Sequence, residues 1–200
     1  SNELGNQMFM YAAGYSISKK LNRNLYIDDE TAFLLKKNIS SYGLNHFNIS
    51  ASIASDNLKF KNLKGYIKRK LLIKTDLLRF KKKFYIEKRD FNKITQFNDD
   101  FLNNNYDNNL FLEGHFESEK YFYDYKKEII NDFTFKYENE LEKNIYLKDL
   151  NVNNTVSICL RQNRFSEGVG KKSTLSKDKS VNFTNEQINY INKSVELIKN

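Results

Sequence analysis

Two arginines, Arg161 and Arg164, follow a β-branched run at residues 155–160. Such a run is typical of a buried strand, and open α/β sheets bind their ligands beyond the carboxyl ends of the strands. The planar guanidinium group of arginine binds phosphate oxygens through two hydrogen bonds. The segment therefore predicts a site for a phosphate or pyrophosphate, with a solvated basic loop as the alternative.

A second candidate is the turn Gly5-Asn6-Gln7, which precedes a segment rich in helix formers at residues 8–21. Backbone N–H groups at a helix N-terminus attract anions, and the Asn and Gln side chains add further donors. The turn thus suits an anionic ligand, while an ordinary Asn-capped turn would use the same residues.

The third candidate is the aromatic segment at residues 114–122, where His115 lies two residues before Glu117. A histidine within reach of a carboxylate can act as a general base. A packed aromatic turn with a partly buried histidine is the alternative.

Other residues give weaker indications of a metal-binding, nucleotide-binding or catalytic site. The pairs Asp28-Asp29 and Asp99-Asp100 could hold a metal and a diphosphate, but both lie in polar loops, where solvation explains them. The two histidines and Cys159 do not have zinc-site spacing, and Cys159 suits a small core position. The chain contains no Walker loop, dinucleotide-binding glycine motif or nucleophile-elbow serine motif.

These candidates need elements to position them. The pattern predicts strands at residues 25–27, 84–86, 110–114 and 155–160, and helices at 8–21, 64–80, 118–133 and 185–199. It predicts a loop at residues 103–109, and a capping box formed by Thr184 and Gln187 at the start of the last helix. Residues 40–63 are weakly patterned and give no firm prediction. The alternation of strands and helices favours an α/β fold with a mainly parallel sheet, divided near residues 150–154.

The 200-residue chain has a formal net charge of +8, from 33 basic and 25 acidic residues. The segment from Lys64 to Asp90 holds eleven basic and three acidic residues, so the remainder of the chain is neutral. An amphipathic basic segment suits an anionic membrane surface, and a solvated helix with a basic face is the alternative. A basic module that binds nucleic acid is also compatible with this charge. A lone cysteine excludes an intrachain disulfide and indicates a reducing compartment.

The three candidate segments together resemble glycosyltransferase family eleven, the α-1,2-fucosyltransferases, in its bacterial branch. That family opens with Gly-Gly-Leu-Gly-Asn-Gln-Met-Phe-Gln-Tyr-Ala, and residues 4–12 read Leu-Gly-Asn-Gln-Met-Phe-Met-Tyr-Ala. Its Gly-Tyr-Phe-Gln-Ser-Glu-Lys-Tyr-Phe motif is similar to Gly-His-Phe-Glu-Ser-Glu-Lys-Tyr-Phe at residues 114–122. Residues 156–161 resemble the strand that carries its His-x-Arg-Arg-Gly-Asp motif. Order and spacing agree over residues 1–165.

The resemblance implies an inverting, metal-independent transfer of L-fucose from GDP-L-fucose to O2 of a galactose-containing glycan, in lipopolysaccharide or capsule synthesis. It implies a GT-B-like α/β fold, in which residues 1–150 form a first, Rossmann-like acceptor-side domain. Residues 151–200 then begin a second, GDP-sugar-binding domain, so we expect the isolated chain to be inactive. We expect no cofactor and no nucleic-acid partner. The expected location is the cytoplasm, with peripheral attachment to the inner face of the cytoplasmic membrane.

The resemblance also implies roles for individual residues. Arg161 and Asn6 would be catalytic, and the donor phosphate and sugar would contact Gly5, Asn6, Gln7, Arg161, Asn163 and Arg164. His115 and Glu117 would lie on the acceptor side, and the candidates for the general base are Glu117, Glu119 and Glu167.

The chain departs from the third motif. Cys159 replaces its histidine, Gln162 its second arginine and Arg164 its aspartate. We expect Arg164 to supply the missing positive charge. A noncatalytic relative that binds GDP-sugar is therefore the alternative to an active transferase.

Overall fold

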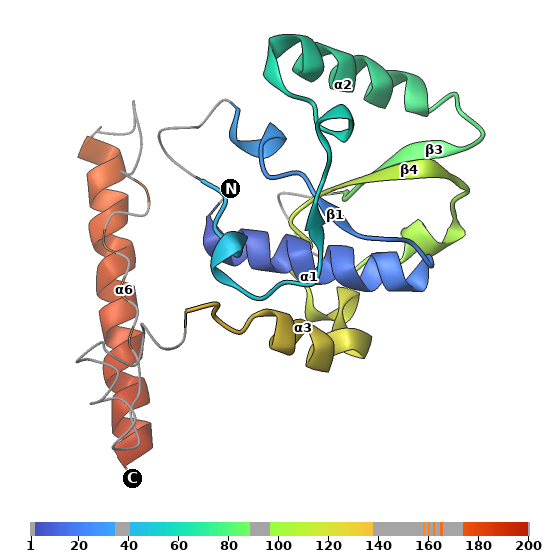
Figure 1. The fold of residues 1–200 in the computed structure, drawn as a ribbon. Coiled ribbons are helices and arrows are strands. Elements are labelled where there is room, and N and C mark those ends of the chain that lie inside the picture. The colour runs from blue at the N-terminus through green and yellow to red at the C-terminus, as the bar shows by residue number, and fades with distance from the viewer. Residues whose placement is uncertain are drawn as a thin grey trace. The chain divides into compact units, whose positions relative to one another are not determined.

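A computed structural model describes residues 3–34, 41–88, 97–137 and 174–199, together with positions 158, 160, 162 and 165 (Figure 1). The chain forms two compact units, Ser1–Glu138 and Asn139–Asn200. The fold is mixed α/β with small parallel sheets, as the alternating pattern predicts. The boundary predicted near residues 150–154 and most of the strand predicted at 155–160 lie outside the described residues.

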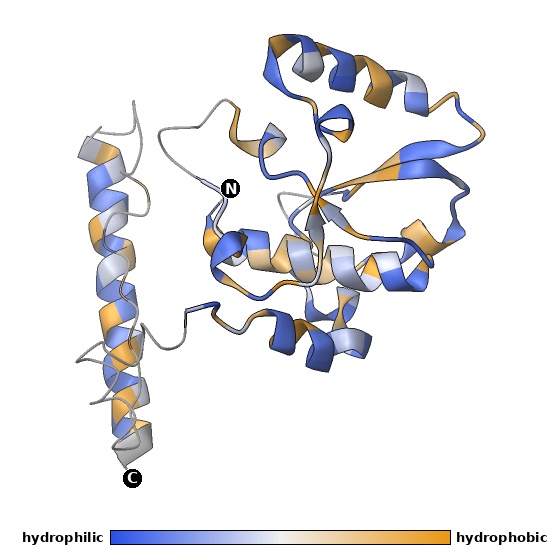
Figure 2. Ribbon diagram, in the orientation of Figure 1, coloured by the Kyte–Doolittle hydropathy of each residue, from blue (hydrophilic) through white to orange (hydrophobic). Residues whose placement is uncertain are grey.

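Helix α1 (Leu4–Lys20) is the buried centre of the first unit. Its residues range from hydrophobic to hydrophilic (Figure 2), and the buried ones are Gln7, Tyr11, Ala12, Ala13, Gly14, Ser16, Ile17 and Ser18. It ends where Asn22 adopts a positive φ of 51°. The predicted helix is confirmed, but it begins four residues earlier than expected. Gly5-Asn6-Gln7 is therefore the first turn of the helix and does not precede it.

Two pairs of parallel strands lie in this unit. β1 (Tyr26–Ile27) pairs with β2 (Ser52–Ile53), and β3 (Lys82–Ile86) pairs with β4 (Tyr106–Glu113). In the second pair Tyr85 lies opposite Leu112 and Ile86 opposite Glu113, so both strands end at the same edge. The predicted strands at 25–27, 84–86 and 110–114 are confirmed, with β4 beginning four residues earlier than expected.

Helix α1 runs antiparallel to β4. Just after the helix, Arg23 Nη1 donates to the carbonyl oxygen of Asp107 at 2.7 Å, at the start of the strand. Near the beginning of the helix, the Phe9 ring lies 6.0 Å from that of Phe122, which follows the strand. The first turn of α1 is therefore on the side where β4 ends.

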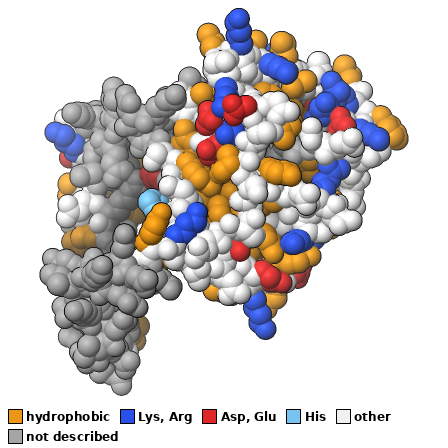
Figure 3. Space-filling view, viewed as in Figure 1, with side chains coloured by type: hydrophobic (Ala, Val, Ile, Leu, Met, Phe, Trp, Pro, Cys, Tyr) orange, Lys and Arg blue, Asp and Glu red, His pale blue; other side chains and the backbone are white. Residues whose placement is uncertain are grey.

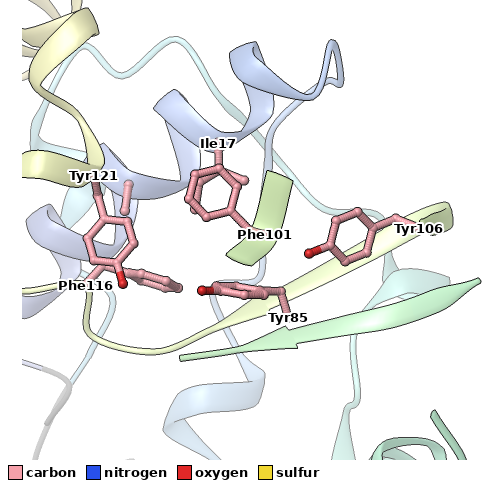
Figure 4. Close-up of a cluster of buried hydrophobic side chains, with 7 residues drawn as sticks. Ile17, Tyr85, Phe101, Tyr106, Phe116 and Tyr121 are labelled. Carbon is pink, nitrogen blue, oxygen red and sulfur yellow. The ribbon is translucent and has the colours of Figure 1, made fainter. Parts of the chain in front are cut away.

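Aromatic side chains fill the space between α1 and the β3–β4 pair (Figure 4). Phe101 and Tyr121 are completely buried, and Phe116 is 2% exposed. Burial raises the pKa of the phenol groups of Tyr85 and Tyr121 above the ordinary value. The core members are Ala13, Ile17, Tyr85, Phe101, Tyr106, Phe116 and Tyr121.

Helix α2 (Asn62–Asp76) lies between the two sheet pairs in sequence. The Asn62 side-chain oxygen accepts the N–H of Gly65, which stabilises the first turn. At the other end the buried Asp76 carboxylate accepts the N–H groups of Lys83 and Phe84. The prediction that this helix reaches residue 80 is wrong, because Asp76 turns the chain into β3.

Three other predictions need correction. The loop predicted at 103–109 is wrong from Tyr106 onward, where β4 begins. The helix predicted at 118–133 is broken into η5 (Glu119–Tyr121), η6 (Tyr123–Tyr125) and α3 (Lys126–Asp132). The last helix, α6, spans Thr174–Lys199, so the predicted capping box at Thr184 is wrong: its hydroxyl donates to Ser180 O inside the helix. The described residues also form the short helices η1 (Thr31–Phe33), η2 (Leu44–His46), η3 (Asp56–Leu58) and η4 (Asp100–Asn103).

No helix within the described residues has both the length and the apolar character that crossing a bilayer requires.

Candidate functional site

The first turn of α1 combines an open glycine with a buried glutamine. Gly5 is exposed, and a Cβ atom added to it would meet no atom within 4 Å. Gln7 is 4% exposed, and its amide is used within the protein. Its Nε2 donates to Ser41 O at 2.9 Å, and its Oε1 accepts the N–H of Gly43 at 2.9 Å. Gln7 therefore fixes the loop at residues 41–43 over the start of the helix.

The helix start is suited to an anion for physical reasons. The peptide dipoles of α1 place partial positive charge at its N-terminus, and the first-turn N–H groups point out of the helix. Because the space beside Gly5 is open, a ligand can approach this backbone closely. Asn6, the residue between Gly5 and Gln7 in the sequence, is half-buried.

A buried carboxylate shapes the turn after β4. Glu87 is 6% exposed, and its Oε2 accepts the N–H groups of His115 at 2.8 Å and Phe116 at 3.0 Å. A Cβ atom on Gly114 would lie 2.5 Å from the Glu87 Cβ, so only glycine fits there. Phe116 has a positive φ of 52°. Glu87 thus holds a tight turn that the chain enters directly from β4.

This turn sets the position of the predicted acceptor-side pair. His115 Nδ1 lies 3.5 Å from Glu117 Oε1, and both side chains are partly exposed. A carboxylate beside an imidazole can orient the ring. Phe116 and Tyr121 point into the core, so the segment is a packed aromatic turn that also presents a His–Glu pair.

The first motif segment is part of α1, and the second, at residues 114–122, packs against that helix through Phe116 and Phe122. Gly5, Asn6 and Gln7 form the first turn of the helix, and Phe116 belongs to the same buried cluster as Ala13. Since Glu87 N also donates to Glu113 O, the ends of β3 and β4 are joined at this edge. We call the first turn of α1 and the turn at residues 114–117 the carboxyl edge.

The aspartate pair after β1 is used within the protein. Asp28 Oδ1 accepts the N–H groups of Glu30 and Thr31, which closes the turn into η1. Asp29 lies 2.6 Å from the buried ammonium group of Lys59, and this hydrogen bond raises the pKa of Lys59 above its ordinary value. In the parts of the chain that the structure describes, no three His, Cys, Asp or Glu side chains gather to hold a metal ion.

Sequence reasoning missed Glu87. Glu87 could have been noticed because it is an acidic residue directly after the strand predicted at residues 84–86. Side chains that bind ligands concentrate at the carboxyl ends of such strands. The sequence showed no sign that its partners would be backbone N–H groups almost thirty residues away.

The predicted donor-binding arginines are not placed. Arg161, Asn163 and Arg164 lie outside the described residues, as do Cys159 and Glu167, and their roles stay predictions. No protein-family model, no curated protein and no solved structure matches this chain.

Proposed function

We propose that the chain supplies the acceptor-side part of an enzyme that transfers L-fucose from GDP-L-fucose to O2 of a galactoside, with inversion and without a metal. One observation supports this most: Gly5, Asn6 and Gln7 form the first turn of a buried helix at the carboxyl edge, with open space beside Gly5. This is where an α/β fold binds a nucleotide-linked substrate.

The chemistry that such a site must supply is the stabilisation of a leaving group. As the bond between fucose and GDP breaks, negative charge accumulates on the β-phosphate. The helix N-terminus offers fixed dipoles that suit such charge. The predicted role of Arg161, a bidentate cation for phosphate, would serve the same purpose. Arg164 would add the second positive charge.

The acceptor hydroxyl must also lose a proton. In an inverting transfer the acceptor attacks from the side opposite the leaving group, so the base and the phosphate-binding groups belong on different sides of the sugar. The His115–Glu117 pair lies on the carboxyl edge, and either side chain can accept a proton. We assign this pair to the acceptor side.

Alanine at Arg161 or at Arg164 is expected to weaken GDP binding about 10- to 100-fold, because each change removes a charge-assisted hydrogen bond. Calorimetry with the 200-residue chain measures this affinity, and the exposed Lys193 of α6, changed to alanine, controls for loss of charge. Unchanged affinity in both arginine variants would overturn the donor-binding assignment.

Gly5→Ala separates stability from ligand binding. Since α1 has open space at this position, alanine should maintain stability or raise the free energy of unfolding by up to about 1 kcal/mol. If GDP approaches the backbone here, the same variant should bind GDP more weakly. Urea unfolding and calorimetry provide the two measurements, and undiminished GDP binding would place the nucleotide elsewhere.

A noncatalytic GDP-sugar-binding protein is the second candidate, because Cys159, Gln162 and Arg164 depart from the third motif of the family. GDP binding without transfer of fucose to any galactoside, in a protein that also contains the complete donor domain, would favour this candidate.

A further inference from the structure

Helix α2 exposes a line of large apolar side chains. Leu63, Ile67 and Leu71 follow one another at four-residue spacing and are 70%, 50% and 59% exposed. Four-residue spacing places them on one face of the helix. The opposite face holds Asp76, which is buried, and Arg69, which pairs with Glu113 of β4. The apolar line therefore points away from the body of the unit.

The turn after α2 continues this surface. Leu77, Leu78 and Phe80 are each more than 80% exposed, although leucine and phenylalanine usually lie inside a folded protein. A group of exposed apolar side chains on consecutive elements marks an interaction site, whereas single ones do not. We call the exposed side of α2, together with residues 77–81, the basic apolar face.

Positive charge surrounds these apolar side chains. Lys64, Lys68, Lys74, Arg79 and Lys81 are exposed and form no ion pair with any described residue. The single acidic residue among residues 62–83 is Asp76, which is buried and accepts N–H groups of β3. Figure 3 shows Lys and Arg side chains interspersed with hydrophobic ones over the region where Figure 1 places α2. Residues 62–83 therefore carry a net positive charge on this face.

We propose that the basic apolar face docks on an anionic lipid bilayer. Its lysines and Arg79 would meet lipid phosphates, while Leu77, Leu78 and Phe80 would enter the boundary between headgroups and acyl chains. Nucleic acid would match the charge but would leave the leucine and isoleucine side chains in water. A protein partner would need an acidic, apolar groove, whereas an anionic bilayer offers both properties over its whole surface. The proposal depends on the exposed side chains of α2 and not on the fucosyl transfer.

Cosedimentation with vesicles tests the docking. The 200-residue chain should pellet with phosphatidylcholine vesicles that contain phosphatidylglycerol and stay in solution with phosphatidylcholine alone. Lys64→Gln, Lys68→Gln and Lys74→Gln combined should weaken binding about 100-fold, since each basic residue near an anionic membrane contributes about 1 kcal/mol. Salt on the order of 0.5 M should weaken binding of the wild-type chain, because it screens the attraction. Leu77→Ser, Leu78→Ser and Phe80→Ser combined should also release the protein.

The matched control removes equal charge from α6, as Lys177→Gln, Lys179→Gln and Lys193→Gln, and should bind vesicles like the wild type. All the substituted side chains are exposed, so circular dichroism and thermal unfolding should stay unchanged.

Failure to pellet with anionic vesicles, equal binding to neutral ones, or wild-type binding by both α2 and turn variants would overturn the proposal. Stronger binding to nucleic acid than to vesicles, lost in the α2 lysine variant, would replace it. GDP affinity should stay the same in every variant, so its loss would bear on the carboxyl edge alone.

Discussion

Phe101→Ala is expected to lower the free energy of unfolding of the first unit by about 3–5 kcal/mol. Phe101 is completely buried, and its ring lies 5.8 Å from that of Tyr85 and 6.5 Å from that of Tyr121. Alanine would leave a cavity in an aromatic core that cannot close over it, and domains are stable by only about 5–15 kcal/mol. Urea denaturation followed by tyrosine fluorescence measures the loss.

The neighbouring Leu102 supplies the control, because it is 47% exposed on the same short helix, η4. Leu102→Ala is expected to cost about 0.5 kcal/mol. Equal destabilisation by the two variants would mean that Phe101 does not lie in the core that Figure 4 shows.

The sequence predicts the parts of the fold whose hydrophobic pattern matches a local period. Helix α1 and strands β1 and β3 follow from runs of apolar residues that end at polar or charged ones. Residues of all three elements pack in the two hydrophobic clusters of the first unit, so burial and local preference agree and the pattern is sufficient.

The elements that the sequence predicts poorly depend on distant contacts. The asparagine-rich stretch at 106–109 has the composition of a loop, yet it forms part of β4 through pairing with β3 and through Arg23, whose guanidinium binds the carbonyl oxygens of Asp107 and Asn108. Tertiary contacts here outweigh strand propensity. Helix α2 ends early for a similar reason, because Asp76 binds the backbone of β3.

The candidate site shows the same division. Gly5, Asn6 and Gln7 could be selected from the sequence because a glycine and two amide side chains stand at the start of a helix. The loop at residues 41–43, which Gln7 holds, could not be predicted from the sequence, because its segment has no periodic hydrophobic pattern. Motif spacing therefore identifies residues at the ends of elements, whereas the groups that hold them in place appear only once the fold is known.

The membrane proposal and the transferase proposal concern different surfaces of the first unit. Helix α2 packs against β3 and pairs with β4 through Arg69 and Glu113, and the carboxyl edge begins directly after Glu113. Docking through the exposed face of α2 would leave that edge uncovered by the helix itself. A membrane-docked transferase would need this separation, because the surface that holds the membrane must not occupy the substrate site.

Glu87→Ala is expected to lower the free energy of unfolding by about 2–5 kcal/mol and to disorder the turn at residues 114–117. Two N–H groups, of His115 and Phe116, would lose their buried acceptor, and each unsatisfied buried donor costs about 1–3 kcal/mol. Since Phe116 holds a positive φ of 52°, the turn has little to stabilise it without this carboxylate. Urea denaturation measures the cost, and amide hydrogen exchange at His115 and Phe116 reports the turn directly.

Glu87→Gln distinguishes the hydrogen bonds from the charge. The amide oxygen can still accept both N–H groups, so this variant should lose only about 1 kcal/mol and keep both amides protected from exchange. Glu119→Ala is the control, because Glu119 is exposed and solvent screens its ion pair with Lys126, so little stability depends on that pair. If Glu87→Ala and Glu119→Ala had equal effects, the turn would be held by its aromatic packing alone. The His115–Glu117 pair would then owe its position to Phe116 and Tyr121 and not to the end of β3.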